Sequence, residues 1–225
     1  MEIKEIYELF DRIGCVTFST VNDGRAESRI AHFFAWDKEG IYFRTMAVKP
    51  FYRQIKESGN ITACGMYPNP EVMHNEQNLP SFHPGYFVRL SGDVRELTME
   101  EVEEKAAGNR DFNVAVYDIK KYPETRIFQV YRAKGECYDY DYAKEHRDHK
   151  LERERFSYGG MEIEPAGLAI TDRCIGCGKC RKVCSFDAIV PGKPYRIMGN
   201  RCDECGNCFA ACPVNAILSK GGKEA

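Results

Sequence analysis

The feature that most constrains this chain is a repeated pattern of eight cysteines. Cys174-x-x-Cys177-x-x-Cys180-x-x-x-Cys184 recurs as Cys202-x-x-Cys205-x-x-Cys208-x-x-x-Cys212, so that each cysteine of the second run follows its counterpart by 28 positions. The same interval separates Ala188-Ile189 from Ala216-Ile217. Because the repeat includes apolar packing residues as well as thiols, we interpret the segment as a duplicated half-domain.

The repeat also sets the expected domain organisation. A chain of 225 residues is long enough for one ordinary domain and a small one, and residues 166–225 hold eight of its 11 cysteines. A unit of that size buries too little apolar surface to depend on a core alone. We therefore expect a larger domain at residues 1–145, a charged linker at 146–165 and a small cysteine-rich domain at 166–225.

The spacing of the cysteines favours iron-sulfur clusters. Two-residue gaps let a short loop wrap a cubane cluster and supply three of its four thiolates, and Gly176, Gly178 and Gly206 permit the tight backbone that this needs. Two alternatives are zinc sites, which favour separated cysteine pairs, and a disulfide scaffold, which a reducing compartment disfavours.

Residues 166–218 resemble the two-cluster bacterial-type ferredoxins. The resemblance implies two 4Fe-4S clusters with crossed ligation, in which the fourth cysteine of each run serves the other cluster. One cluster would have Cys174, Cys177, Cys180 and Cys212 as ligands, and the other Cys202, Cys205, Cys208 and Cys184. The sequence departs from the family at Ser185, where the second run has Pro213 after its last cysteine.

The first 145 residues read as a mostly β domain. Ile3, Ile6 and Phe10 recur at helical spacing, and strand patterns follow at 15–21, 27–36, 41–45, 60–67, 86–96, 126–133 and 136–142. Helices are expected at 50–57 and, after the capping box Thr98-x-x-Glu101, through 107. Residues 68–84 read as a long polar loop. Hairpin connections between the strands suggest a small antiparallel β-barrel.

This part of the chain resembles the pyridoxamine-phosphate-oxidase-like proteins. The motifs that carry the resemblance are Arg29-Ile30-Ala31-His32, the turn Asp37-Lys38-Glu39-Gly40, Ile41-Tyr42-Phe43-Arg44-Thr45, Gln54-Ile55 and Phe87-Val88-Arg89-Leu90-Ser91-Gly92. The resemblance implies a split β-barrel that binds FMN in a groove between the two subunits of a homodimer. The substrate-binding segment of the true oxidases has no counterpart, because the cysteine-rich domain occupies that part of the chain.

The resemblance also implies a set of flavin-binding residues. Arg29 and its neighbours match the segment that lines FMN, and Arg44-Thr45 matches a dipeptide near its phosphate. The basic pair of the oxidases falls at Pro50-Phe51, with Lys49 as the nearest cation. Cationic groups suit a phosphate dianion through charge-assisted hydrogen bonds. The candidates are Arg29, Ile30, Ala31, His32, Arg44, Thr45, Lys49, Pro50 and Phe87, while a role for His74 or His83 in the long loop stays open.

The two cofactors together indicate a redox function. We expect an FMN-dependent iron-sulfur oxidoreductase acting on a small organic substrate or electron acceptor, with a one-electron partner such as ferredoxin; its catalytic residues and substrate are unassigned. The alternatives are an electron-transfer protein without its own substrate and a sensor that binds haem or flavin. A net charge of −2 argues against a nucleic-acid or membrane-surface binder. The absence of a long apolar run and of a secretory-type N-terminus favours the cytoplasm.

Overall fold

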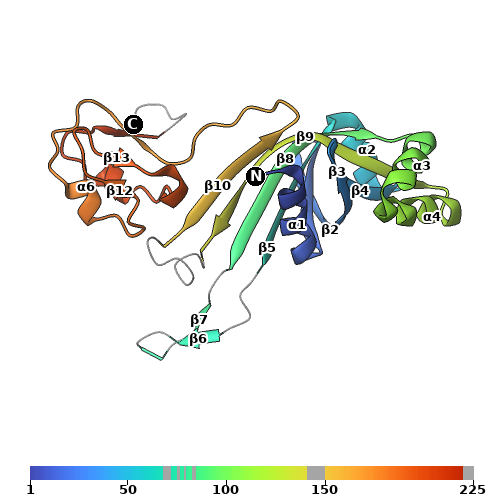
Figure 1. Ribbon diagram of the computed structural model, residues 1–225, viewed down its shortest axis with the longest axis horizontal. Coiled ribbons are helices and arrows are strands. Elements are labelled where there is room, and N and C mark those ends of the chain that lie inside the picture. Colours follow the sequence, from blue (N-terminus) through green and yellow to red (C-terminus); the bar gives the residue numbers. More distant parts are fainter. Residues whose placement is uncertain (68–71, 75–76, 79, 83–84, 141–149, 220–225) are drawn as a thin grey trace. The chain divides into compact units, whose positions relative to one another are not determined.

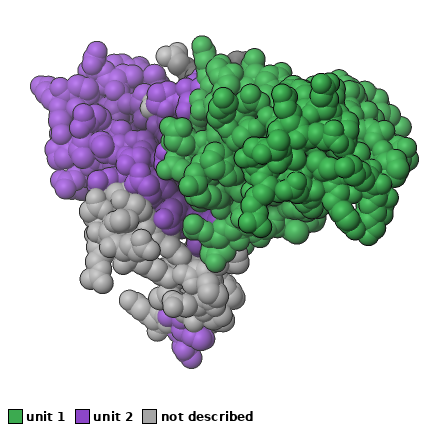
Figure 2. All heavy atoms as spheres, turned by 45° about the vertical axis from the view of Figure 1, so that its right-hand side comes forward, with its two compact units in different colours: residues 1–67, 88–135, 156–162 green, residues 68–87, 136–155, 163–225 purple. Residues whose placement is uncertain are grey.

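The computed structural model describes residues 1–67, 72–74, 77–78, 80–82, 85–140 and 150–219 (Figure 1). The chain divides into two compact units (Figure 2). Unit 1 comprises residues 1–67, 88–135 and 156–162, and unit 2 comprises residues 68–87, 136–155 and 163–225. None of the helices in the described ranges has the length and apolar character of a membrane-spanning helix.

An antiparallel sheet forms the frame of unit 1. The strands run in the order β2-β1-β5-β8-β9-β4-β3, and β10 pairs with β9. The registers of β1 with β2 and β5, and of β4 with β3 and β9, are antiparallel. The bounds are β1 (Val16–Asn22), β2 (Arg25–Ala31), β3 (Phe33–Asp37), β4 (Gly40–Met46), β5 (Asn60–Tyr67), β8 (Tyr86–Glu96), β9 (Thr125–Asp139) and β10 (Glu152–Tyr158).

Four α-helices accompany this sheet: α1 (Ile3–Ile13), α2 (Pro50–Ser58), α3 (Met99–Gly108) and α4 (Asn113–Lys121), with a short 3₁₀ turn at Arg110–Phe112 before α4. The expected capping box opens α3, because the Glu101 amide donates to the Thr98 hydroxyl and the Thr98 amide donates to the Glu101 carboxylate. Pro50 stands in the first turn of α2, where its missing N–H costs nothing.

The core of unit 1 is aromatic. The Phe18 ring lies 4.9 Å from that of Phe33 and 5.1 Å from that of Phe43, and Phe43 stacks on Phe128 at 5.5 Å. Phe10 of α1 meets Phe33 edge-on at 5.1 Å. These rings are almost entirely shielded from solvent. Helices α3 and α4 cover a second cluster, which includes Tyr42, Phe112, Ala115 and Ile127.

Unit 2 preserves the sequence repeat in its structure. Helix α6 (Lys179–Lys182) and helix α7 (Asn207–Ala210) lie 28 positions apart, as do strands β12 (Ile189–Val190) and β14 (Ile217–Leu218). Strand β11 (Ala169–Ile170) pairs with β14, and β12 pairs with β13 (Arg196–Ile197), so each half of the repeat ends in a two-stranded ribbon. A 3₁₀ turn at Gly199–Arg201 precedes the second cysteine run.

Several expected elements differ in the structure. The strand expected at 27–36 breaks at His32 into β2 and β3, and the strands expected at 126–133 and 136–142 form the single strand β9. The expected loop at 68–84 contains the hairpin of β6 (Val72–His74) and β7 (Pro80–Phe82). Residues 146–165, expected as a linker, include β10. Helix α4 was not predicted.

Candidate functional site

The eight cysteines of the repeat, all in unit 2, line two separate cavities. Cys174, Cys177, Cys180 and Cys212 line one of them. Cys184, Cys202, Cys205 and Cys208 line the other. Each set therefore combines three cysteines from one run with the last cysteine of the other run, which is the crossed arrangement that the ferredoxin resemblance implies.

The backbone places corresponding thiols in the same way in both halves. Gly178 and Gly206 adopt left-handed conformations immediately before α6 and α7, so the third cysteine of each run lies in the first turn of a helix. The amide of Ala188 lies 3.4 Å from Cys184 Sγ, and the amide of Ala216 lies 3.2 Å from Cys212 Sγ. These N–H groups favour the thiolate form that an iron-sulfur cluster requires.

The thiols are otherwise unfavourable places for negative charge. Burial raises the pKa of Cys208 to about 11, with Cys202 and Cys184 nearby adding to the effect. Burial likewise raises the pKa of Cys180 and of Cys202. A bound metal cluster replaces the protons and compensates this charge. The donor set, the cavity and the amides directed at sulfur fit a 4Fe-4S cluster in each half.

The four thiols of each set surround one space, which is the arrangement that a cubane with cysteines at its corners demands. Within the described ranges, no group of three or more His, Cys, Asp or Glu side chains is found that could hold a single metal ion.

A second candidate site is an open groove in unit 1, with a volume of about 700 Å³. The ends of β2 and β4, the start of α2 and the α4 region form its walls. Eight of the nine predicted flavin-binding residues line it. The lining comprises Glu27, Arg29, Ile30, Ala31, His32, Arg44, Thr45, Met46, Lys49, Pro50, Phe51, Asp118, Tyr122 and Thr125.

Arg29 is held rigidly at this groove. Its Nη1 donates to the Thr20 hydroxyl at 2.7 Å, and its Nη2 donates to Oε1 of the buried Gln54, also at 2.7 Å. The guanidinium lies 4.3 Å above the Phe51 ring. Gln54 in turn donates to Glu27 at 2.6 Å, and hydrogen bonds from Asn22 and Gln54 lower the pKa of Glu27. Glu27 therefore remains ionised beside Arg29.

Arg44 and Lys49 bring two further cations to the groove. Arg44 Nε lies 3.1 Å from Asp118 Oδ2, while its Nη1 is a buried donor without a hydrogen-bond partner in the described part of the chain. Lys49 is the exposed N-cap residue of α2, and Pro50 and Phe51 of the first turn also line the groove. An unused guanidinium N–H and a helix N-terminus at one wall favour an anionic ligand.

The histidine candidates separate in the structure. His32 lines the groove, and partial desolvation of its ring, with Arg44 nearby, lowers its pKa. His74 lies exposed on β6 in unit 2. His83 lies outside the described residues. Of the two candidates that the structure describes, His32 belongs to the groove.

Phe87 is the one flavin candidate that does not line this groove. It belongs to unit 2, where its ring meets that of Tyr140 edge-on at 5.6 Å. The candidates named from the sequence did not include six residues that line the groove, which are Glu27, Met46, Phe51, Asp118, Tyr122 and Thr125. Glu27 was open to prediction, since it precedes Arg29 by two on the same strand and so shares its face. Asp118 could not be predicted, because it lies on α4 and no sequence pattern indicated this helix.

Comparison with known proteins identifies the C-terminal segment. Residues 173–217 match the family of 4Fe-4S dicluster domains. This match confirms the ferredoxin-type domain, and together with the sheet of unit 1 it confirms the expected fold class, mostly antiparallel β followed by a small ferredoxin-type α+β domain. No curated protein matches the chain.

Several solved structures are similar to the chain. A NimC/NimA family protein from Clostridium acetobutylicum has 16% identity, a TM-score of 0.49, and coverage of 69% of this chain and 92% of its own. A pyridoxamine 5'-phosphate oxidase-related, FMN-binding protein from Nostoc punctiforme has 12% identity, a TM-score of 0.43, and coverage of 72% and 92%. A putative pyridoxamine 5'-phosphate oxidase from Listeria innocua has 11% identity, a TM-score of 0.39, and coverage of 56% of this chain and 90% of its own.

Proposed function

We propose that this protein is an FMN-dependent iron-sulfur oxidoreductase that passes electrons between two 4Fe-4S clusters and a flavin and reduces a small organic substrate or an electron acceptor. When bound, FMN exchanges one or two electrons and each cluster exchanges one, so the pair links single-electron carriers to two-electron chemistry. The observation that carries the proposal is the pair of cavities with crossed cysteine sets, in the same chain as a cationic groove.

The chemistry of the groove supports FMN as its ligand. Three cations, Arg29, Arg44 and Lys49, face two carboxylates, Glu27 and Asp118, so the lining has a net charge of +1 for a phosphate dianion. Arg44 Nη1 offers a donor that none of the residues described by the structure uses. The aliphatic and aromatic residues Ile30, Ala31, Pro50 and Phe51 supply apolar surface for a flat ring system, and Thr45 supplies a hydroxyl.

We further propose a homodimer with the flavin between two subunits, as the sequence resemblance implies. The groove is open, and the side chain of Ile30 at its edge is 67% exposed. Phe87 remains a candidate for flavin binding through the sequence resemblance alone. A one-electron donor or acceptor such as ferredoxin is the expected partner, and the cytoplasm the expected location.

The spectrum of anaerobically purified protein tests the proposal. Flavin bands together with broad iron-sulfur absorption are the expected result, and released FMN and iron are then quantified. A haem band in place of flavin bands would favour the sensor. Steady-state turnover with a reduced low-potential donor separates the oxidoreductase from an electron-transfer protein without its own substrate, since the latter reduces a protein partner but no small molecule.

A further inference from the structure

The two halves of the repeat differ between the first two cysteines of each run. Where the first run has Ile175-Gly176, the second has Asp203-Glu204. Gly176 and Glu204 both adopt left-handed conformations, with φ of 71° and 58°. Glycine tolerates this conformation, whereas a residue with a Cβ disfavours it. The second half therefore has a glutamate at a position whose backbone conformation favours glycine. Strain of this kind indicates that the side chain has a structural or functional role.

Interactions of the Glu204 side chain account for its retention. Its Oε2 lies 2.8 Å from Arg153 Nη1, and its Oε1 lies 3.6 Å from Arg155 Nη2. The amide of Gly167 donates to Oε1 at 2.8 Å. Both arginines come from β10, and the neighbouring Asp203 accepts from the Tyr140 hydroxyl at 3.0 Å. By contrast, the corresponding side chain in the first half, Ile175, is 59% exposed.

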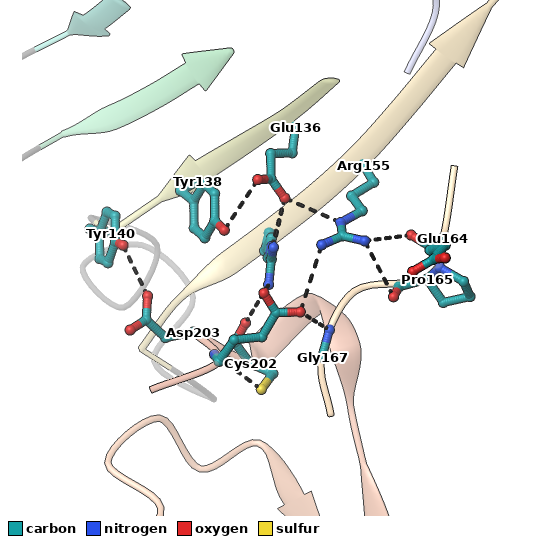
Figure 3. Close-up of polar contacts among 11 residues, drawn as sticks. Glu136, Tyr138, Tyr140, Arg155, Glu164, Pro165, Gly167, Cys202 and Asp203 are labelled. Carbon is teal, nitrogen blue, oxygen red and sulfur yellow. Dashed lines mark hydrogen bonds and ion pairs between the residues drawn. The ribbon is translucent and has the colours of Figure 1, made fainter. Parts of the chain in front are cut away.

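The network continues to a buried carboxylate (Figure 3). Arg153 is 2% exposed and Glu136 of β9 is 3% exposed, and both Arg153 Nε and Nη2 lie within 2.9 Å of Glu136 Oε2. Arg155 Nε donates to the same oxygen at 3.2 Å. The Arg153 guanidinium also lies 4.7 Å above the Tyr138 ring. Buried charges of this kind persist only when they are paired and hydrogen-bonded.

This network reaches a cluster ligand directly. Arg153 Nη1 donates to the backbone oxygen of Cys202 at 3.3 Å. The amide of Glu204 lies 3.4 Å from Cys202 Sγ, and its direction depends on the left-handed backbone that the ion pairs hold. Hydrogen bonds to sulfur and nearby charge are two of the factors that set cluster potentials.

We propose that Arg153 and Glu204 are positioning residues for one cluster only, the cluster of Cys184, Cys202, Cys205 and Cys208, and that they set its reduction potential apart from that of the other cluster. The proposal rests on the iron-sulfur part of the proposed function and is independent of the flavin. The observation on which it depends is that Glu204 replaces the glycine of the first half and forms ion pairs with two arginines outside the repeat, Arg153 and Arg155.

The charges of the network predict the direction in which each substitution shifts the reduction potential of this cluster. Arg153, Arg155, Glu136 and Glu204 together carry no net charge. Arg153→Met leaves one net negative charge beside the cluster, which disfavours the added electron and lowers the potential. Glu204→Gln leaves one net positive charge and raises it. Loosening of the loop alone would not move the potential in opposite directions in the two variants.

The experiment is an anaerobic redox titration of the full chain followed by electron paramagnetic resonance. The variants Cys177→Ala and Cys205→Ala each remove a ligand from one set and so assign the two signals. We expect Arg153→Met to lower, and Glu204→Gln to raise, the potential of the signal that Cys205→Ala removes, each by about tenfold in the reduction equilibrium, or about 59 mV for one electron. The other signal should stay in place.

Matched controls and iron analysis complete the test. Arg196→Met and Glu164→Gln remove the same charges from exposed positions of unit 2 and should move neither signal. Loss of about four of eight irons in Arg153→Met, with the Cys177-dependent signal intact, also supports the proposal. Equal shifts of both signals, or no shift, would overturn it. If Arg153→Met does not fold, the near-isosteric Glu204→Gln decides alone. Wild-type protein with zinc and no sulfide would instead end the iron-sulfur function itself.

Discussion

At the residue scale, Arg44 and Lys49 bring charge to the groove in different ways. Arg44 is fixed by Asp118 and still has an unused donor, whereas Lys49 is exposed at the start of α2 and is mobile about four side-chain bonds. A fixed donor loses less conformational entropy when a ligand binds. We therefore expect Arg44 to contribute more to phosphate binding than Lys49 does.

The first prediction is that Arg44→Ala and Lys49→Ala weaken FMN binding. Loss of a charge-assisted contact costs about 1.5–3 kcal/mol, or roughly ten- to hundredfold in Kd, with Arg44→Ala at the upper end. Fluorescence quenching of FMN on binding measures the change, and the cluster spectrum should be unaltered. Lys38→Ala, at an exposed turn outside the groove, is the control. Wild-type affinity in both groove variants would place the phosphate elsewhere.

A second prediction concerns His32. Burial and the proximity of Arg44 lower its pKa in the folded state, while the unfolded chain has the ordinary pKa of about 6.5. As the pH falls through about 6.5, the unfolded chain takes up the proton first, so stability is highest above this pH and decreases below it. Between about pH 7.5 and 5.5, wild-type protein should lose more stability in urea titrations than His32→Asn. An equal loss in both proteins would contradict the prediction.

Residue types alone did not predict the groove, whose candidates came from a family resemblance, and they predicted the isolated cysteines poorly. Arg29, Arg44 and Lys49 line one groove in the structure, while their role in binding flavin stays a prediction. Cysteines outside a metal site are usually buried as small apolar residues, which predicts burial for Cys15, Cys64 and Cys137, yet of these three Cys15 and Cys64 are exposed and Cys137 is buried. Along β5 burial alternates, and Cys64 follows the buried Ala63, so its position in the strand overrides its residue type.

At the element scale, Gly135 explains why β9 appeared as two strands. Gly135 falls between the strands expected at 126–133 and 136–142, but in the structure it lies inside β9. A Cβ at this position would collide with the backbone oxygen of Arg89 and would lie 2.6 Å from the Phe156 ring. The glycine therefore permits a close approach of chain segments and does not interrupt the strand.

The third prediction follows from this crowding. Gly135→Ala should destabilise unit 1 by about 1–3 kcal/mol, because neither the Arg89 backbone nor the buried Phe156 ring has space to move. Chemical denaturation monitored by circular dichroism measures the loss. Lys134→Ala changes the adjacent, exposed residue and should be near neutral. If Gly135→Ala matches that control, the approach is looser than the structure has it.

Elements with a regular apolar period were predictable, and those dominated by charge were not. The strands at 60–67 and 86–96 and the helix at 50–57 were predicted to within a residue of β5, β8 and α2. In β10, the ion pairs of Arg153 allow its charged side chain to be buried. The charged run from Glu152 to Arg155 has the composition of a linker, and the strand was therefore not predicted. These ion pairs are tertiary and have no local signature.

At the scale of the whole molecule, we expect the folding of residues 166–218 to depend on metal. In the described part of this segment, one buried apolar cluster comprises Cys180, Ile189, Cys208 and Ile217, and two of these four are predicted cluster ligands. The fourth prediction is that protein kept from oxygen contains close to eight iron and eight sulfide per chain, and that chelation unfolds residues 166–218. Protease digestion should then release this segment before unit 1. Resistance of the metal-free segment to protease would show a self-sufficient core.

The sequence predicted a separate cysteine-rich unit, but it did not predict where the boundaries between the two units lie. The 28-residue repeat places the cysteine-rich unit by itself, since no other part of the chain has its periodicity. The chain, however, passes between units after Tyr67, Phe87, Gly135, Arg155 and Glu162, where the sequence suggested a single linker. Long-range contacts decide this, because residues 68–87 and 136–155 join the cysteine-rich residues 163–225 in one unit although other segments separate them in the sequence.

The last prediction is that the clusters lie on the electron path to the flavin. Covalent connection keeps the two cofactors at high effective concentration, which favours exchange within one molecule over exchange between molecules. Replacing Cys177 and Cys205 by Ala removes one ligand from each cluster and should leave FMN bound, because no predicted cluster ligand lines the groove. In stopped-flow experiments with reduced ferredoxin as donor, flavin bleaching should slow by at least about a hundredfold in this variant, whereas Cys64→Ala, at an exposed cysteine of unit 1, should bleach like wild type. If the double variant keeps the wild-type rate, the donor reduces the flavin directly, and the clusters do not lie on the path of electron transfer to it.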